Sequence, residues 1–164
     1  MSNGIPLAAL ADVDGTAKLF STALRREVTA TVVKPLAEES LLVGGHYVNG
    51  AGTVVGGCFA DKAFAAHAGA ALSLVPAAVA QESIASDGLD EILMENFAEV
   101  LNICSRLFDR GSDQRITLRT VEEAGTPRSA ASLSMLRSPA KRHDLELDIA
   151  GYGRGRVVLA VVSA

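Results

Sequence analysis

The chain has 164 residues, of which 49% are hydrophobic and only 4% aromatic, and its formal net charge is -4. This length suits one domain, which we expect to span residues 1–164 with a core of aliphatic side chains. The negative charge argues against nucleic acid as a partner, because phosphate binding requires an excess of lysine and arginine.

The first part of the chain predicts a helix followed by a strand. Apolar residues recur at helical spacing over 12–26, which is typical of an amphipathic helix. The segment 28–33 is rich in β-branched residues that alternate with threonine and alanine. We therefore expect it to form a strand.

A β-hairpin is predicted next. Two apolar runs, 41–48 and 53–59, are joined by the sequence Asn49-Gly50-Ala51-Gly52. Asn-Gly is a strong hairpin signal because both residues tolerate a positive φ. Both runs also contain paired glycines, which predict β-bulges or the close approach of a helix to the sheet. These glycines are Gly44, Gly45, Gly56 and Gly57.

An uncharged, alanine-rich stretch at 63–80 follows the hairpin. It contains His67 and is interrupted by Pro76. Alanine contributes little transfer free energy, and neither part is long enough to cross a bilayer. We expect no membrane insertion, but a buried helix that Asp61 caps and that ends near Leu74, followed by a loop.

The segment from Asp90 to Asp109 predicts a long amphipathic helix, capped by Asp87 or Ser86 and ended by Gly111. Apolar residues occupy one face. The opposite face carries an acidic stripe at spacing i, i+4, i+7, which places its members in line. The stripe consists of Glu95, Glu99 and Asn102.

Two interpretations of this stripe are open on the residues alone. Most polar helix faces are merely solvated. However, Glu95 and Glu99 form a like-charge pair that costs a few tenths of a kcal/mol, and Asn102 costs roughly 0.5 kcal/mol relative to alanine. These small costs suggest a surface that was not selected for stability.

The last third of the chain predicts further strands. Alternating patterns occur at 115–121 and 143–150, and an apolar run occupies 157–162. The glycine-rich sequence 151–155 has no following helix, so a hairpin turn is favoured over a phosphate loop. The order of helices and strands predicts an α+β fold with a mostly antiparallel sheet, covered by the long helix and further helices.

The remaining candidate sites are weak. The basic stretch 128–142 lacks interleaved aromatic residues, so we interpret it as a solvated loop and not as a nucleic-acid patch. Three histidines have no metal-ligand spacing around them, and no bound metal is expected. They are His46, His67 and His143.

The two cysteines, Cys58 and Cys104, lie among apolar neighbours. A free buried cysteine behaves as a small hydrophobe, and two cysteines do not make a disulfide framework. Residues 1–10 lack a basic region followed by an apolar run, so no signal peptide is expected. Together these features favour a cytoplasmic location.

The sequence Glu95-Asn-Phe-Ala-Glu99-Val-Leu-Asn102 resembles the active-site helix of the CheC/CheX/FliY family of chemotaxis phosphatases. The family pattern is Asp or Ser, three residues, Glu, two residues and Asn, with a proline some two dozen residues later. Glu99 and Asn102 match the acid and the amide, and Pro127 follows a little late. Glu95 departs from the usual Asp or Ser. Only one copy of the pattern is present, which resembles the one-site arrangement of CheX.

The resemblance implies a CheX-like domain that dephosphorylates the phospho-aspartate of a CheY-type response regulator. Asn102 would orient the attacking water, Glu99 would dock to the regulator's lysine, and Glu95 would be an accessory residue. The receiver domain would supply Mg²⁺, so this chain needs no cofactor. The resemblance also allows a homodimer. The alternative is a non-catalytic adaptor on the same fold that binds a receiver domain or a signalling partner.

Overall fold

The computed structural model describes residues 6–109, 115–123 and 126–163. They form one six-stranded sheet in the order β1-β5-β6-β3-β2-β4, in which every neighbouring pair is antiparallel. The strands are β1 (Val28–Val32), β2 (Val43–Val48), β3 (Val54–Ala60), β4 (Thr117–Glu122), β5 (Lys141–Ile149) and β6 (Gly153–Val161). The helices are α1 (Val13–Leu24), α2 (Lys62–Leu72), α3 (Ala77–Ala85), α4 (Glu91–Ile103) and α5 (Ala130–Arg137), with the short 3₁₀ turns η1 (Glu38–Ser40) and η2 (Cys104–Leu107). The predicted α+β class with an antiparallel sheet is confirmed.

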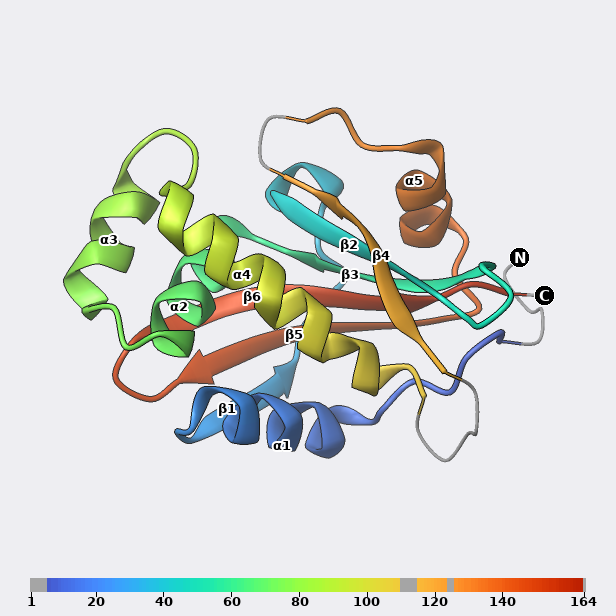
Figure 1. Cartoon of the computed structure of the whole chain (residues 1–164), viewed down its shortest axis with the longest axis horizontal. Helices are drawn as coiled ribbons and strands as arrows, with labels where there is room; N and C mark the ends of the chain where they lie inside the picture. Colours follow the sequence, from blue (N-terminus) through green and yellow to red (C-terminus); the bar gives the residue numbers. More distant parts are fainter. Residues whose placement is uncertain (1–5, 110–114, 124–125, 164) are drawn as a thin grey trace.

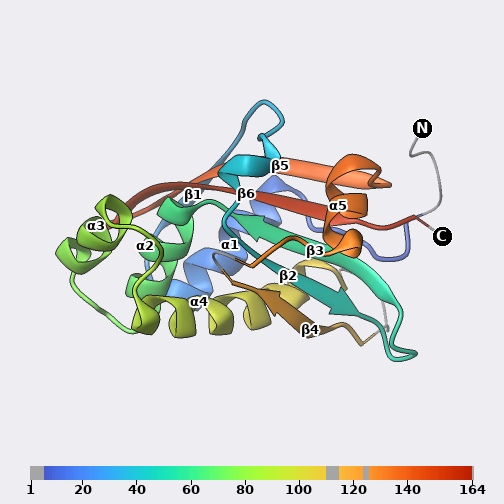
Figure 2. The ribbon, with the colours of Figure 1, turned by 90° about the horizontal axis from the view of Figure 1, so that it is seen from above.

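Helices cover both faces of the sheet (Figures 1 and 2). Helices α1, α2 and α4 pack on one face and α5 on the other. Because successive side chains of a strand point to opposite faces, β6 contributes to both layers of the core. Val157, Leu159 and Val161 join the larger cluster beneath α1, α2 and α4, whereas Val158 and Ala160 join the cluster beneath α5.

Helix α2 is held between the sheet and α4 by two glycines. A Cβ atom at Gly155 of β6 would lie 2.3 Å from the Cα atom of Phe64, and one at Gly69 of α2 would lie 2.5 Å from the carbonyl oxygen of Leu93. Both distances are too short for a side chain, so the two contacts require glycine. The prediction of a turn over 151–155 is therefore wrong in part, because Gly153–Gly155 belong to β6 and receive α2 there.

The two predicted hairpins are present. Asn49 Oδ1 accepts hydrogen bonds from the amides of Ala51 and Thr53, each at 3.0 Å, in the β2–β3 turn. Gly151, with φ of 83°, lies in the turn between β5 and β6. The register of β2 shifts against β3 between Tyr47 and Val48, next to Gly56, and against β4 between His46 and Tyr47, so Gly44 and Gly45 do not lie at a bulge. All four paired glycines lie where side chains pack closely on the sheet, as expected for the close approach of a helix. Strand β6 is central, between β5 and β3, so it cannot pair edge to edge with a strand of a second molecule in a homodimer.

Two helices lie where none was predicted. The alanine-rich stretch forms α2 and then, after Pro76, the separate helix α3 instead of a loop, because proline suits the start of a helix as well as an exit from one. Helix α5 occupies part of the basic stretch, and Ser129 caps it by accepting a hydrogen bond from the Ser132 amide at 3.2 Å. In the part of the chain that the structure describes, no helix combines the length and apolarity needed to cross a membrane.

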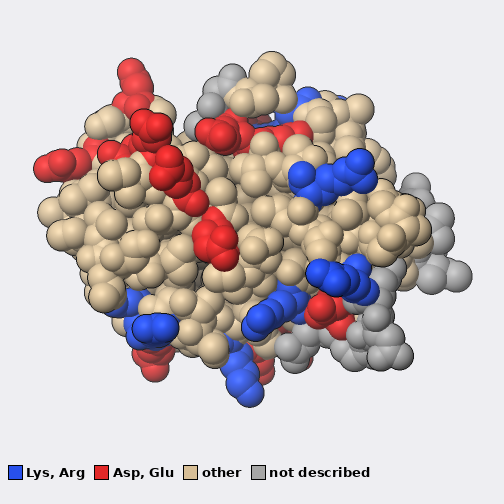
Figure 3. Space-filling model, viewed as in Figure 1, with Lys and Arg blue, Asp and Glu red and all other residues tan. Residues whose placement is uncertain are grey.

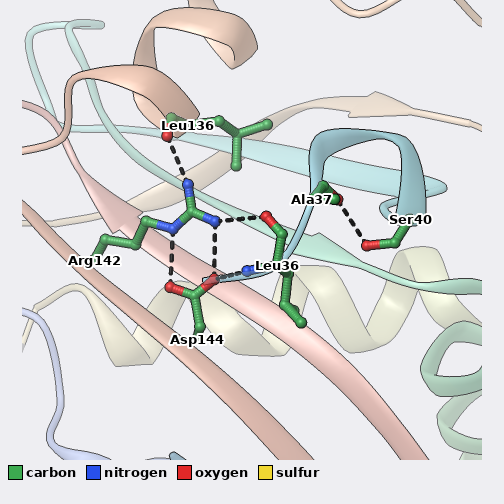
Figure 4. A network of polar contacts seen from close by, with 6 residues as sticks. All are labelled: Leu36, Ala37, Ser40, Leu136, Arg142 and Asp144. Atoms are coloured by element: carbon green, nitrogen blue, oxygen red, sulfur yellow. Dashed lines mark hydrogen bonds and ion pairs between the residues drawn. The ribbon is translucent and has the colours of Figure 1, made fainter. Parts of the chain in front are cut away.

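The interpretation of 128–142 as a solvated loop is also wrong for Arg128 and Arg142, which are half-buried, whereas Arg137 is exposed. Figure 4 shows the guanidinium of Arg142 paired with Asp144, with Nε 2.9 Å from Oδ1 and Nη2 2.8 Å from Oδ2. Its remaining donors reach the carbonyl oxygens of Leu136, at 2.6 Å, and Leu36, at 3.1 Å. Arg128 likewise donates to the carbonyl oxygens of Glu38 and Leu41. These arginines fasten loops and α5 to the sheet.

Candidate functional site

Helix α4 carries all three residues of the predicted stripe. It begins after Asp90, whose Oδ1 accepts hydrogen bonds from the amides of Ile92 and Leu93 at 3.0 and 3.2 Å. The predicted caps, Asp87 and Ser86, are wrong, because the segment between α3 and Asp90 is not helical. The helix is also shorter than predicted: it ends at Ile103 and tightens into η2. The predicted stop at Gly111 lies outside the described residues.

The inner face of α4 is fixed by packing and by hydrogen bonds. Four of its apolar side chains are fully or almost fully buried, as the helical spacing predicted, and Met94 is buried with them. The four are Leu93, Phe97, Val100 and Leu101. Phe97 packs edge-on against Phe64 of α2, with ring centroids 5.8 Å apart. Asn96 Nδ2 donates to the carbonyl oxygen of Gly69 at 2.9 Å. The Tyr47 hydroxyl of β2 donates to the carbonyl oxygen of Leu101 at 2.5 Å.

Replacing Tyr47 with phenylalanine tests how firmly the end of α4 is held. The substitution removes the hydroxyl that binds the Leu101 carbonyl but keeps the ring, which stacks on Phe108 with centroids 4.6 Å apart. We expect the free energy of unfolding to fall by about 1 kcal/mol. Urea unfolding followed by circular dichroism measures this, and a variant as stable as the wild type would contradict the proposed anchoring.

The outer face of α4 presents the stripe to solvent. Glu95, Glu99 and Asn102 are all exposed. Among the described residues, none of the three side chains has a hydrogen-bond or salt-bridge partner within the chain. Glu99 and Asn102 are three residues apart on one helix, so their backbones are separated by a rise of about 4.5 Å. The backbone that carries the pair is therefore held by the packed inner face of α4, while both side chains are exposed to solvent.

A groove of about 590 Å³ runs along the first half of α4. Its lining comes from the loop before α4, from α4 itself and from the end of β4: Gly88, Leu89, Glu91, Met94, Glu95, Ala98, Val121 and Glu123. Figure 3 shows acidic side chains gathered over this part of the surface. Glu95 thus lines the groove, whereas Glu99 and Asn102 lie further along the helix.

A second polar cluster lies away from α4, between β2, β4 and α5. His46 Nε2 lies 2.5 Å from Ser132 Oγ, which in turn donates to Glu122 Oε1 at 2.6 Å. Because Ser132 has one hydroxyl proton and gives it to Glu122, it accepts from His46 Nε2, which therefore carries a proton. Burial lowers the pKa of His46 and so favours its neutral form. Burial raises the pKa of Glu122, but hydrogen bonds from Ser129 and Ser132 outweigh it, so the pKa is lowered overall. Ser132 is fully buried, so the cluster holds α5 on the sheet.

Lowering the pH should destabilise the protein through its histidines. Burial lowers the pKa of His46, and the charge of Glu122 offsets only part of this effect; burial also lowers the pKa of His67 and of His143. Below the ordinary value of 6.5, the unfolded chain therefore binds more protons than the folded one. The free energy of unfolding should fall as the pH drops from there toward the lowered pKa values, by at most about 1.4 kcal/mol per pH unit for each histidine.

Urea unfolding at several pH values between about 7.5 and 5.5 measures this dependence. His46→Gln keeps a neutral donor for Ser132 and should make the dependence shallower. A wild-type stability that stays constant or rises as the pH falls would contradict the assignment of neutral, buried histidines.

The sequence identified the stripe but missed the groove and the cluster. The groove joins α4 to residues at the end of β4, and the cluster joins β2 to the same end of β4. These elements are far apart in the sequence, so residue spacing does not predict that they meet. The consecutive acids Glu122 and Glu123 at the end of an alternating strand were the available signal, since one of them must point inward. Pro127, the proline of the family pattern, is exposed in the connection between β4 and α5.

Comparison with known proteins shows the fold. No protein-family model and no curated protein sequence matches the chain. A chain of the FliM–SpeE complex from H. pylori matches with a TM-score of 0.59 and 12% identity, over 92% of this chain and 81% of that one. The FliM middle domain from H. pylori matches with a TM-score of 0.56 and 12% identity, over 92% and 84%. FliY from Thermotoga maritima matches with a TM-score of 0.53 and 15% identity, over 90% and 82%.

The chain therefore has a CheC/CheX/FliY-like fold, which the resemblance of its motif helix predicted. These likenesses, at 12% to 15% identity, concern the path of the backbone.

Proposed function

We propose that this protein accelerates hydrolysis of the phospho-aspartate of a CheY-type receiver domain. In this proposal Asn102 orients the attacking water and Glu99 docks to the active-site lysine of the regulator. The main support is the exposure of Glu99 and Asn102, side by side, on a helix whose inner face is fixed by the sheet and by α2. A partner can reach both side chains without any rearrangement of α4.

The proposed hydrolysis requires only one component from this protein, which is a correctly positioned water molecule. An acyl phosphate is already reactive, and the receiver domain would bring Mg²⁺ and its lysine, so the missing component is a water molecule in line with the phosphorus. The carboxamide of Asn102 can hold that water, because its oxygen accepts a hydrogen bond while its NH₂ group donates to a phosphoryl oxygen. It stays neutral throughout and does not act as a base.

Glu99 would supply orientation rather than chemistry. A carboxylate that binds the receiver's lysine by a charge-assisted hydrogen bond fixes the position of the receiver relative to Asn102. The short rise between the two residues places the docking contact and the water contact within one active site. Misplacement by about 1 Å costs on the order of 10²-fold in rate, so a rigid helix suits this task.

A second candidate is a non-catalytic adaptor on the same fold. The observation that favours it is Glu95, which stands where the phosphatase pattern has Asp or Ser and which lines a groove instead of flanking Asn102. FliM, which shares the fold, forms complexes with FliG and SpeE. An adaptor would bind a receiver domain or a flagellar or signalling protein without changing the lifetime of its phosphate.

A survey of receiver domains tests the proposal. Each receiver domain encoded in the same genome is phosphorylated with acetyl phosphate, the donor is removed, and the decay of the phospho-aspartate is followed with and without this protein. We expect at least one receiver to lose its phosphate about 10-fold or more faster in its presence. Unchanged lifetimes for every receiver would contradict the phosphatase, and binding without any change in lifetime would select the adaptor.

A further inference from the structure

We infer that the groove beside α4 is the docking site for a short basic segment of the receiver-domain partner, one that also carries a large apolar side chain. The identity of the partner rests on the proposed function. In this inference Glu95 is a specificity-determining residue of the groove and takes no part in the reaction. It would explain why a glutamate stands at the position where the family pattern has Asp or Ser.

The groove has an apolar floor and an acidic rim. Leu89, Ala98 and Val121 are half-buried and form the floor together with Met94, which is 8% exposed. The rim carries three exposed carboxylates, which belong to Glu91, Glu95 and Glu123. This combination fits an apolar side chain in the floor with positive charges above it.

The charge of the rim selects the partner. Within the described part of the chain, none of the rim carboxylates is paired with a lysine or arginine. An acidic or purely apolar partner would desolvate these carboxylates or repel them without compensation, whereas lysine or arginine side chains would pair with them. Charge complementarity therefore favours a basic segment over the other occupants of such a groove.

The position of the groove links docking to the proposed reaction. Glu95 and Asn102 are seven residues apart on the same side of α4, which corresponds to a rise of about 10 Å. A receiver domain whose basic segment lies between Glu95 and Glu123 would thus have a neighbouring part of its surface over Asn102. The groove would set the identity and orientation of the partner, and Asn102 would act on its phosphate.

Charge reversal at the rim tests the inference. The variant Glu95→Lys/Glu123→Lys is compared with the wild type and with Glu27→Lys, a control at an exposed glutamate outside the groove. The probe is a fluorescently labelled receiver domain from the survey, and its Kd is measured at low and high salt. We expect the double variant to raise the Kd at least about tenfold at low salt and to flatten its salt dependence, because rim charges act through screened attraction. The control should bind as the wild type does.

The companion variant Asn102→Ala separates this inference from the proposed function. If both hold, Asn102→Ala loses turnover with an unchanged Kd, while the groove variant raises KM and keeps kcat. If the groove variant weakens binding but the wild type does not shorten the phosphate lifetime, the groove stands and the phosphatase fails. If the groove variant, folded by circular dichroism, binds every receiver as tightly as the wild type, or if no receiver binds at all, the inference is overturned.

Discussion

Replacing Asn102 with alanine should remove the acceleration of phospho-aspartate hydrolysis, about 10-fold or more, and return the phosphate lifetime to that of the receiver domain alone, while the protein stays folded. The size of the effect follows from the loss of one positioned hydrogen-bonding group in a transition state. The side chain is exposed and has no partner among the described residues, so its removal leaves no buried group unsatisfied. Alanine is also the better helix former, and the free energy of unfolding should stay constant or rise by a few tenths of a kcal/mol.

Two further variants make this result specific to the amide. Asn102→Asp keeps the shape but loses the donor and adds a negative charge next to the phosphate, so it should be as inactive as alanine. Thr22→Ala, at an exposed position of α1, should keep full activity. Phosphate release and thermal unfolding measure the two properties side by side, and an Asn102→Ala protein with wild-type activity would remove Asn102 from the mechanism.

Replacing Gly69 with valine should lower the free energy of unfolding by about 3 kcal/mol. A Cβ atom at this position would lie 2.5 Å from the carbonyl oxygen of Leu93 and 3.3 Å from its carbonyl carbon. These are backbone atoms of α4, so they cannot rotate away as a side chain can. The helices must separate, which loosens the contact of Asn96 with the Gly69 carbonyl and shifts the site-bearing helix.

The matched control is Gly50→Val in the β2–β3 turn. A Cβ atom there meets nothing within 4 Å, and its backbone is not left-handed. This variant should unfold close to the wild-type denaturant concentration. If Gly69→Val were equally stable, the close crossing of α2 and α4 would not be what positions the stripe.

The sequence predicted the fold well where periodicity was strong. The β2–β3 hairpin was predicted from Asn-Gly, and the buried face of α4 from apolar residues at helical spacing. Prediction from the sequence failed where the same residue pattern is compatible with two different structures. Pro76 indicates the end of a helix but also begins α3, and the composition of 128–142 predicts a solvated loop although Arg142 pairs with the buried Asp144.

Only one part of the candidate site, the stripe on α4, could be predicted from the sequence. Glu95, Glu99 and Asn102 lie on one helix, so their common face follows from helical geometry. The groove needs Val121 and Glu123, which reach α4 only because β4 pairs with β2 at the edge of the sheet. No local pattern encodes that pairing. The sequence therefore predicted Glu95 as an accessory residue beside Glu99 and Asn102 but did not show that it also faces Val121 and Glu123 across a groove.

The most direct test of the proposed activity is phosphate release under multiple turnover. The protein is mixed with a twentyfold excess of a receiver domain that is continuously rephosphorylated by acetyl phosphate, and inorganic phosphate is measured over time. The proposed phosphatase releases many phosphates per molecule, at a rate proportional to its concentration and lost in Asn102→Ala. Release at the receiver's own rate, with binding still detected, would contradict the phosphatase and identify the protein as an adaptor.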